Sequence, residues 1–311
     1  VNVASLDYIR GLEKLLKETA PMTLHWYLVW RVIMVHGTSL DRETALLVRE
    51  LGALVDGVHS KIEPRRHGCI TWMEQSFAPL IARYFVAQQS SGMAMEAARN
   101  VTEQLRETFI TRARELDWLD NATRDKVVEK VMSSILKIGA PTYPNTESAT
   151  DLDAYYASYQ MNATHHFENV LAYERFSARQ QYLKIGQAVH PGEWLLPASS
   201  VNMYYSRFDN AIVVPAGILQ PPFYSHDHPS YYNYGSLGMF IAHELSHAFD
   251  DRGRKFDATG QLHDWWTKGT SNEFNKKAEC FQSQYARYTV DGPDGARLRV
   301  NGALTLSEIM A

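Results

Sequence analysis

Two histidines four residues apart are the residues of this sequence best suited to chemistry. His243 and His247 stand in the segment His-Glu-Leu-Ser-His, with Glu244 beside the first histidine. In a helix, residues four apart lie on the same face, so both imidazoles can reach one Zn²⁺ ion. A carboxylate next to the first ligand can take a proton from a zinc-held water. The pattern predicts a site for one zinc with Glu244 as general base, although so short a motif also recurs by chance.

A catalytic zinc site needs a third protein ligand and keeps its fourth position for water. Glu308 has apolar neighbours on both sides, namely Leu304, Leu306, Ile309 and Met310. Such flanks favour burial, and a buried carboxylate without a partner is costly. They therefore predict a buried, partnered glutamate on a helix beneath the zinc site, whereas an isolated glutamate would ordinarily be a solvated surface residue.

Apolar residues at regular spacing predict the elements that position this centre. The expected helices cover 5–19 with Ser5 as N-cap, 24–35 as a mostly buried helix, 72–86, 93–116, a helix capped by Asp120, 152–184, 231–250 and 264–288. Residues 199–205 and 211–214 are rich in β-formers and predict a hairpin. Prolines and a glycine exclude a regular helix or strand through 215–223, which is expected to form a fixed loop.

Composition sets the class of protein. The 311 residues are 45% hydrophobic and 21% charged, which is typical of a globular protein. The net charge of −4 has no long run of one sign, which argues against a nucleic-acid partner. No segment is long and apolar enough to predict a membrane span. Because the sequence starts without Met and stops in mid-pattern, we expect a fragment of a longer protein.

Cysteines and glycosylation sequons bear on the compartment. The sequence has two cysteines, Cys69 and Cys280, which from the residues alone are either reduced thiols or one long-range bridge. The sequons at Asn100, Asn121 and Asn162 are glycosylation candidates that favour a secreted context, although such triplets are common.

Four blocks in the second half of the chain resemble the neprilysin family of zinc metallopeptidases (peptidase family M13), which includes the endothelin-converting enzymes. The blocks are 201–205 (VNMYY), 215–223 (PAGILQPPF), 243–253 (HELSHAFDDRG) with 264–266 (DWW), and 304–311 (LTLSEIMA). They fall in order at family-like spacing. The helical first half is also similar, notably around Trp118-Leu119-Asp120, so the resemblance covers essentially the whole chain.

The resemblance implies a role for each matched position. It implies that His243, His247 and Glu308 hold zinc and that Glu244 first activates water and then protonates the leaving amine. Asn202, with Met203 beside it, would bind the substrate backbone as an added β-strand. Asp250 would be the partner of a zinc histidine. An apolar pocket for the residue after the scissile bond would be lined by Ile218, Phe223, Met239 and Phe240, for which plain core packing is the alternative.

The resemblance also implies the architecture: a mainly α fold with a small β-sheet (α+β), in two lobes. Residues 1–189 would form mainly the helical lobe, and residues 190–311 most of a thermolysin-like catalytic lobe that is incomplete at its C-terminus. The family pattern G-E-N-x-A-D reads Ser307-Glu308-Ile309-Met310-Ala311 here. The aspartate of that pattern, a histidine, an arginine and any N-terminal anchor are expected outside this span. Cys69 and Cys280 would bridge to cysteines outside it and not to each other.

The implied activity is zinc-dependent cleavage of internal bonds in oligopeptides, on the amino side of apolar residues. The expected location is extracellular or at the cell surface, as a secreted protein or as the ectodomain of a type II membrane protein. Peptides are the expected partners, and any membrane contact would come from an anchor outside this span. The first alternative is a homologue or truncated chain that binds zinc or peptide without turnover. The second is a zinc aminopeptidase, for which the sequence lacks a G-x-M-E-N-like block.

Overall fold

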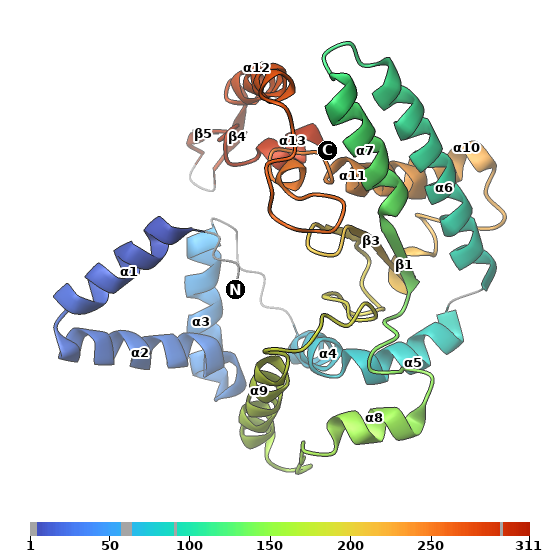
Figure 1. The fold of residues 1–311 in the computed structure, drawn as a ribbon. Coiled ribbons are helices and arrows are strands. Elements are labelled where there is room, and N and C mark those ends of the chain that lie inside the picture. The colour runs from blue at the N-terminus through green and yellow to red at the C-terminus, as the bar shows by residue number, and fades with distance from the viewer. Residues whose placement is uncertain (1–4, 57–63, 90–91, 293–294) are drawn as a thin grey trace. The chain divides into compact units, whose positions relative to one another are not determined.

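A computed structural model describes residues 5–56, 64–89, 92–292 and 295–311 (Figure 1). The chain forms two compact units. One unit contains Val1–Glu63 and Tyr159–Arg179, and the other contains Pro64–Ser158 and Gln180–Ala311. The candidate site lies in the second unit. The expected division into lobes at residue 189 stays a prediction.

The first unit is helical. It holds α1 (Leu6–Glu18), α2 (Pro21–His36), the 3₁₀ turn η1 (Gly37–Ser39), α3 (Arg42–Asp56) and most of α9 (His166–Leu183). The predicted cap is confirmed, because the Ser5 side chain accepts from the Tyr8 amide at 3.2 Å. The helix predicted over 24–35 is also present, but its expected burial is wrong: none of the 16 residues of α2 is buried. Apolar composition favours a helix here without supplying the second surface that burial needs.

The second unit contains the remaining helices. They are α4 (Arg65–Ser76), α5 (Ala78–Gln89), α6 (Gly92–Glu115), α7 (Asn121–Ser133), α8 (Ala149–Tyr156), α10 (Ser230–Asn233), α11 (Met239–Ser246), α12 (Lys268–Tyr285) and α13 (Leu306–Met310). Asp120 caps α7 as predicted, accepting from the Thr123 amide at 2.8 Å. Two predicted helices are interrupted. The helix over 72–86 breaks at Phe77, and the helix over 152–184 is divided into α8 and α9 by turns at 157–165.

A three-stranded sheet lies at the centre of the second unit. Its order is β1 (Ile135–Gly139), β3 (Ala211–Pro215) and β2 (Tyr204–Ser206). β2 and β3 form the predicted antiparallel hairpin, although β2 is shorter than the predicted 199–205. β1, which was not predicted, pairs with β3 in parallel, with Ile135 opposite Ala211. A separate hairpin joins β4 (Thr289–Asp291) and β5 (Arg297–Arg299). The class is thus mostly helical with small sheets, as expected.

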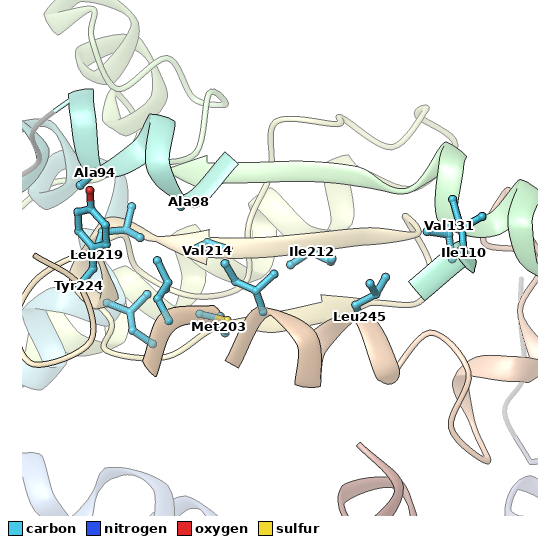
Figure 2. Close-up of a cluster of buried hydrophobic side chains, with 13 residues drawn as sticks. Ala94, Ala98, Ile110, Val131, Met203, Ile212, Val214, Leu219, Tyr224 and Leu245 are labelled. Atoms are coloured by element: carbon cyan, nitrogen blue, oxygen red, sulfur yellow. The ribbon is translucent and has the colours of Figure 1, made fainter. Parts of the chain in front are cut away.

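Two clusters of buried side chains stabilise this unit. The larger cluster packs β3 between α6 and α11, and Figure 2 shows Ile212 and Val214 on the strand with Leu245 on the helix. The smaller cluster joins α12 to α13 through Trp266, Phe274, Ala278 and Leu306. No helix among the described residues is long and apolar enough to cross a membrane.

Candidate metal centre and active site

The histidine pair is positioned by the buried face of its own helix. α10, a π-helical turn (Tyr234–Gly238, η3) and α11 follow one another without a break. Leu237, Ile241 and Leu245, spaced four apart, are at most 1% exposed and face the core. At about 100° per residue, positions two residues away from this stripe lie on the opposite side of the helix. His243 and His247 occupy those positions and are therefore directed away from the core.

Glu308 on α13 completes a group of three donor atoms. Its Oε2 lies 3.4 Å from His243 Nε2 and 3.7 Å from His247 Nε2, and the two Nε2 atoms are 3.1 Å apart. Tetrahedral zinc with bonds of roughly 2.0–2.2 Å separates its ligands by roughly 3.3–3.6 Å. Two imidazoles and one carboxylate at these separations fit zinc, and one tetrahedral position is left for water.

The exposure of Glu308 differs from the prediction. Its side chain is 69% exposed, against 29% for His243 and 17% for His247. Glu308 has the predicted partners but not the predicted burial, because the short α13 turns Leu306, 5% exposed, toward the smaller cluster. Figure 1 shows α13 near the end of α11.

Asp250 fixes the orientation of His247. Its Oδ2 lies 2.8 Å from His247 Nδ1, and its Oδ1 accepts from the amides of Arg252 at 2.8 Å and Gly253 at 2.5 Å. Burial works to raise the pKa of Asp250, but these hydrogen bonds hold that pKa below its usual value. The hydrogen bond to Asp250 in turn raises the pKa of His247. Because the carboxylate of Asp250 accepts a hydrogen bond from Nδ1–H of His247, the lone pair of His247 is on Nε2, where it can bind a metal ion.

Glu244 is a buried carboxyl beside these donors. It is 7% exposed. Burial raises its pKa, the charge of His247 and the backbone amide of Tyr205 oppose the rise, and the charge of Glu308 adds to it. A carboxyl whose pKa is raised toward neutrality is better matched to proton transfer at neutral pH. Glu244 therefore has the environment of a general base.

A polar cavity of about 410 Å³ joins these groups to one edge of the sheet. Asn202 and Met203 line it near β2, which is an edge strand of the order β1-β3-β2. Asn202 is exposed, and its Oδ1 accepts from the Met203 amide at 2.9 Å. Its amide NH₂ group has no hydrogen bond among the described residues and is available to a ligand.

Other residues that line the cavity were not predicted. They are Tyr204, Tyr205, Arg207, Arg252, Gly253 and Ser307. All of them lie within five residues of Asn202, Asp250 or Glu308, so proximity in sequence to the predicted residues was the signal that could have found them.

The four residues expected to line an apolar pocket lie elsewhere. Ile218 is buried in the larger cluster, and Phe223 and Phe240 pack against it with their ring centroids 5.4 Å apart. Met239 is 51% exposed. None of the four lines the 410 Å³ cavity. Their role in recognising the residue after a scissile bond stays a prediction.

The cysteines and sequons are at the surface. Cys69 and Cys280 are both exposed and free. Asn100, Asn121 and Asn162 are exposed as well. Bridges to cysteines outside this span and glycosylation of the three asparagines stay predictions.

Family models match both halves of the chain. Residues 1–141 and residues 202–311 match two models described as Peptidase family M13. Human membrane metallo-endopeptidase-like 1 is 33% identical over 316 residues, which is 100% of this chain and 40% of that protein. Mouse neprilysin is 33% identical over 313 residues, which is 100% of this chain and 41% of that protein. The chain thus spans about two fifths of these relatives.

Solved structures of zinc metalloproteases and related proteins also resemble this chain. The zinc metalloprotease Zmp1 of Mycobacterium tuberculosis, in complex with an inhibitor, has a TM-score of 0.81 and 27% identity over 97% of this chain and 44% of its own. PepO of Lactobacillus rhamnosis has a TM-score of 0.79 and 26% identity over 89% of this chain and 42% of its own. By sequence and by fold, this chain belongs to peptidase family M13, the family of neprilysin.

Proposed function

We propose that the protein from which this chain comes is a zinc-dependent endopeptidase that cleaves internal bonds of oligopeptides on the amino side of apolar residues. The observation that carries the proposal is the set of three donor atoms on His243, His247 and Glu308 at tetrahedral separations, with the buried Glu244 beside them. Family membership supports the same reaction class.

Each residue of the centre has a role in this proposal. When bound, Zn²⁺ supplies Lewis-acid polarisation of a carbonyl and lowers the pKa of water. Glu244 accepts the proton of the attacking water and returns it to the leaving amine nitrogen. Asp250 keeps His247 in the tautomer whose Nε2 is a ligand. Asn202 binds the backbone of a peptide that adds to the edge of the sheet at β2.

The rest of the proposal concerns the whole protein. A helical lobe that encloses a thermolysin-like lobe would admit oligopeptides and exclude folded proteins. Residues 1–189 and 190–311 would contribute mainly to the first and the second lobe. We also propose an extracellular or cell-surface location, supported by the name membrane metallo-endopeptidase-like of the human relative.

The zinc dependence is tested with Glu244→Gln. Wild-type protein is stripped with a chelator, titrated with Zn²⁺ by calorimetry, and assayed on an internally quenched peptide. Glu244→Gln should lower turnover by about 10²- to 10⁴-fold, the usual contribution of a general base, and leave zinc affinity within a few-fold. The matched control is Glu273→Gln on α12, where a carboxylate paired with Lys276 is removed outside the cavity that holds the three ligand atoms.

The outcomes separate the alternatives. Absence of zinc binding by the wild type would overturn the proposal. Zinc binding without hydrolysis of any peptide would identify a chain that binds metal without turnover. Equal cleavage of N-acetylated and free peptides would exclude an aminopeptidase, which needs a free amino terminus.

A further inference from the structure

Lys130 is a fully buried lysine outside the group of proposed ligands. It lies on α7 and is 0% exposed. Its Nζ donates to the carbonyl oxygens of Ala248 at 2.8 Å, Gly253 at 2.8 Å and Phe256 at 2.6 Å. All three acceptors belong to the segment that leaves the C-terminal end of the histidine helix.

The surroundings of this amine suit a charged ammonium. Lysine is almost never fully buried without a partner. Only the ammonium has three N–H donors, and here it meets three acceptors. Burial lowers the pKa of Lys130 to about 7, while the charges of Asp250 and Asp257 oppose this shift. The rings of Tyr205, Phe249 and Trp265, with centroids 5.4–5.9 Å from Nζ, add cation–π attraction.

The segment that Lys130 holds is in direct contact with the histidine helix. The Gly253 carbonyl accepts from Lys130, and the Gly253 amide donates to Asp250, which binds His247 Nδ1. A Cβ added to Gly253 would lie 1.8 Å from the His247 carbonyl oxygen. The backbone at Gly253 therefore lies against the last turn of the helix, with its carbonyl bound to Lys130 and its amide bound to Asp250.

The same lysine is tied to the strand that borders the cavity. Its backbone carbonyl accepts from Asn210 Nδ2 at 2.9 Å, and Asn210 Oδ1 accepts from the Tyr205 hydroxyl at 2.7 Å. Asn210, 1% exposed, has a φ of 47°, a conformation that asparagine tolerates better than most residues. Lys130 thus joins the turn after the histidines to the β2–β3 hairpin.

We propose that Lys130 is a positioning residue for the metal centre: by holding the carbonyls of Ala248, Gly253 and Phe256, it fixes the turn that directs Asp250 onto His247. This inference rests on the proposed zinc site. It places a determinant of zinc affinity on α7, in the half of the chain that contains no zinc ligand.

The test is a double-mutant cycle between Lys130→Met and Asp250→Ala, with Zn²⁺ affinity measured by calorimetry. Loss of an outer partner of a zinc histidine commonly weakens metal binding by about 10- to 100-fold. Each single variant should show a loss of that size. Because both substitutions act through the orientation of His247, the double variant should bind zinc no more weakly than the single variant that has the lower zinc affinity.

The control is Val131→Ala, which removes from the same helix a buried side chain, 1% exposed, that lines neither of the cavities that Asp250 borders. It should lower thermal stability and leave zinc affinity unchanged. A metal-free readout is hydrogen exchange of the Gly253 amide, which should accelerate in Lys130→Met and not in Val131→Ala.

Should Lys130→Met fail to fold, Gly253→Ala replaces it, because its methyl group would displace the turn from the His247 carbonyl and should cause a similar loss of affinity. Unchanged zinc affinity in a folded Lys130→Met protein, or strictly additive losses in the cycle, would overturn the inference. Failure of the wild type to bind zinc would instead overturn the proposed function.

Discussion

His243 and His247 stand on a helix whose opposite face is buried in the larger core cluster, whereas Glu308 stands on a helix of five residues. On the histidine side, Leu237, Ile241 and Leu245 are essentially inaccessible. On the glutamate side, α13 is fully described and Leu306 is its one buried residue. The imidazoles are thus oriented by the fold, while the carboxylate depends on a small docked element.

The polar contacts of the histidine helix and of α13 differ in the same way. His247 is held by Asp250, which is itself 5% exposed and bound by two backbone amides. On the glutamate side, the Ser307 hydroxyl donates to Asp251 at 2.5 Å, and Leu306 and Met310 pack with Phe249 in the smaller cluster. We infer that the histidines are preorganised for a metal ion, and that the ion would itself contribute to ordering Glu308.

Removal of one ligand from each side is expected to give the largest effects. His247→Ala should weaken zinc binding on the order of 10³-fold or more, since each ligand carries several kcal/mol of the binding free energy. Glu308→Gln should weaken it less, because an exposed carboxylate on a short helix loses more entropy on binding. Calorimetric titration of the metal-free proteins measures both losses of affinity. Equal losses would show that the histidines and Glu308 do not differ in how well the fold orients them.

Substitutions that create a cavity beneath the histidine helix or beneath α13 are expected to differ in how much of the second unit they destabilise. Leu245→Ala should destabilise the whole second unit by about 2–5 kcal/mol, the usual cost for a buried leucine. Leu306→Ala should mainly release α13, with a smaller change in global stability. Urea unfolding measures the first effect, and hydrogen exchange of the α13 amides measures the second. A global loss of equal size in Leu306→Ala would show that α13 is part of the cooperative core.

Asp120 joins α7, which contributes to the larger cluster, to the start of α12, which packs with α13 in the smaller cluster, and its substitution should give the smallest effect. It caps α7 and accepts from the side chains of Thr267 and Thr270 at the start of α12. These hydrogen bonds, the one from Thr267 first, hold its pKa well below the usual range. The stability they give is therefore complete above about pH 4, the pKa of an unperturbed aspartate, and is lost as pH falls toward the folded pKa.

The measurement compares wild type with Asp120→Asn in the metal-free protein. Asparagine still caps α7, but hydrogen bonds to a charged acceptor are worth about 1 kcal/mol more than those to a neutral one, so the wild type should be more stable by about 1 kcal/mol at pH 6. This difference should shrink below pH 4. Because Asp120 is exposed, added salt should reduce the difference further. A difference that stays constant down to pH 2 would exclude the ionised carboxylate as its source.

Local patterns were predictable from the sequence, and contacts between distant segments were not. The histidine pair needs only a helix, and the caps Ser5 and Asp120 act within their own first turns. The break between α8 and α9 also has a local signal, because Asn162 Oδ1 accepts from the Thr164 amide in a turn that the apolar spacing concealed.

The features that were missed depend on partners far along the chain. Leu304 and Leu306 favoured burial for the segment, but which side of α13 faces the cluster was decided by α12. Lys130 had no local signal, because a lysine on an amphipathic helix is ordinarily at the surface and its acceptors begin 118 residues later. The burial expected for α2 failed for the same reason, since it depends on a surface that its own composition does not specify.

Because β1 pairs with β3 in parallel, the proposed metal centre depends on contacts between segments that are far apart in the sequence. β3 becomes the central strand only after the chain has returned from Gly139 to Ala211, and closure of so long a loop is slow compared with formation of the β2–β3 hairpin. A segment that begins after residue 189 and contains all three proposed ligands would therefore present β3 with an open edge, ready to pair with other chains. A single backbone cut between β1 and β2 need not have this result, because the two pieces still carry complementary strands and can reassemble. In this fold, the segment that contains the zinc motif is not expected to fold without β1, whereas the chain is expected to tolerate a cut in the connection from β1 to β2.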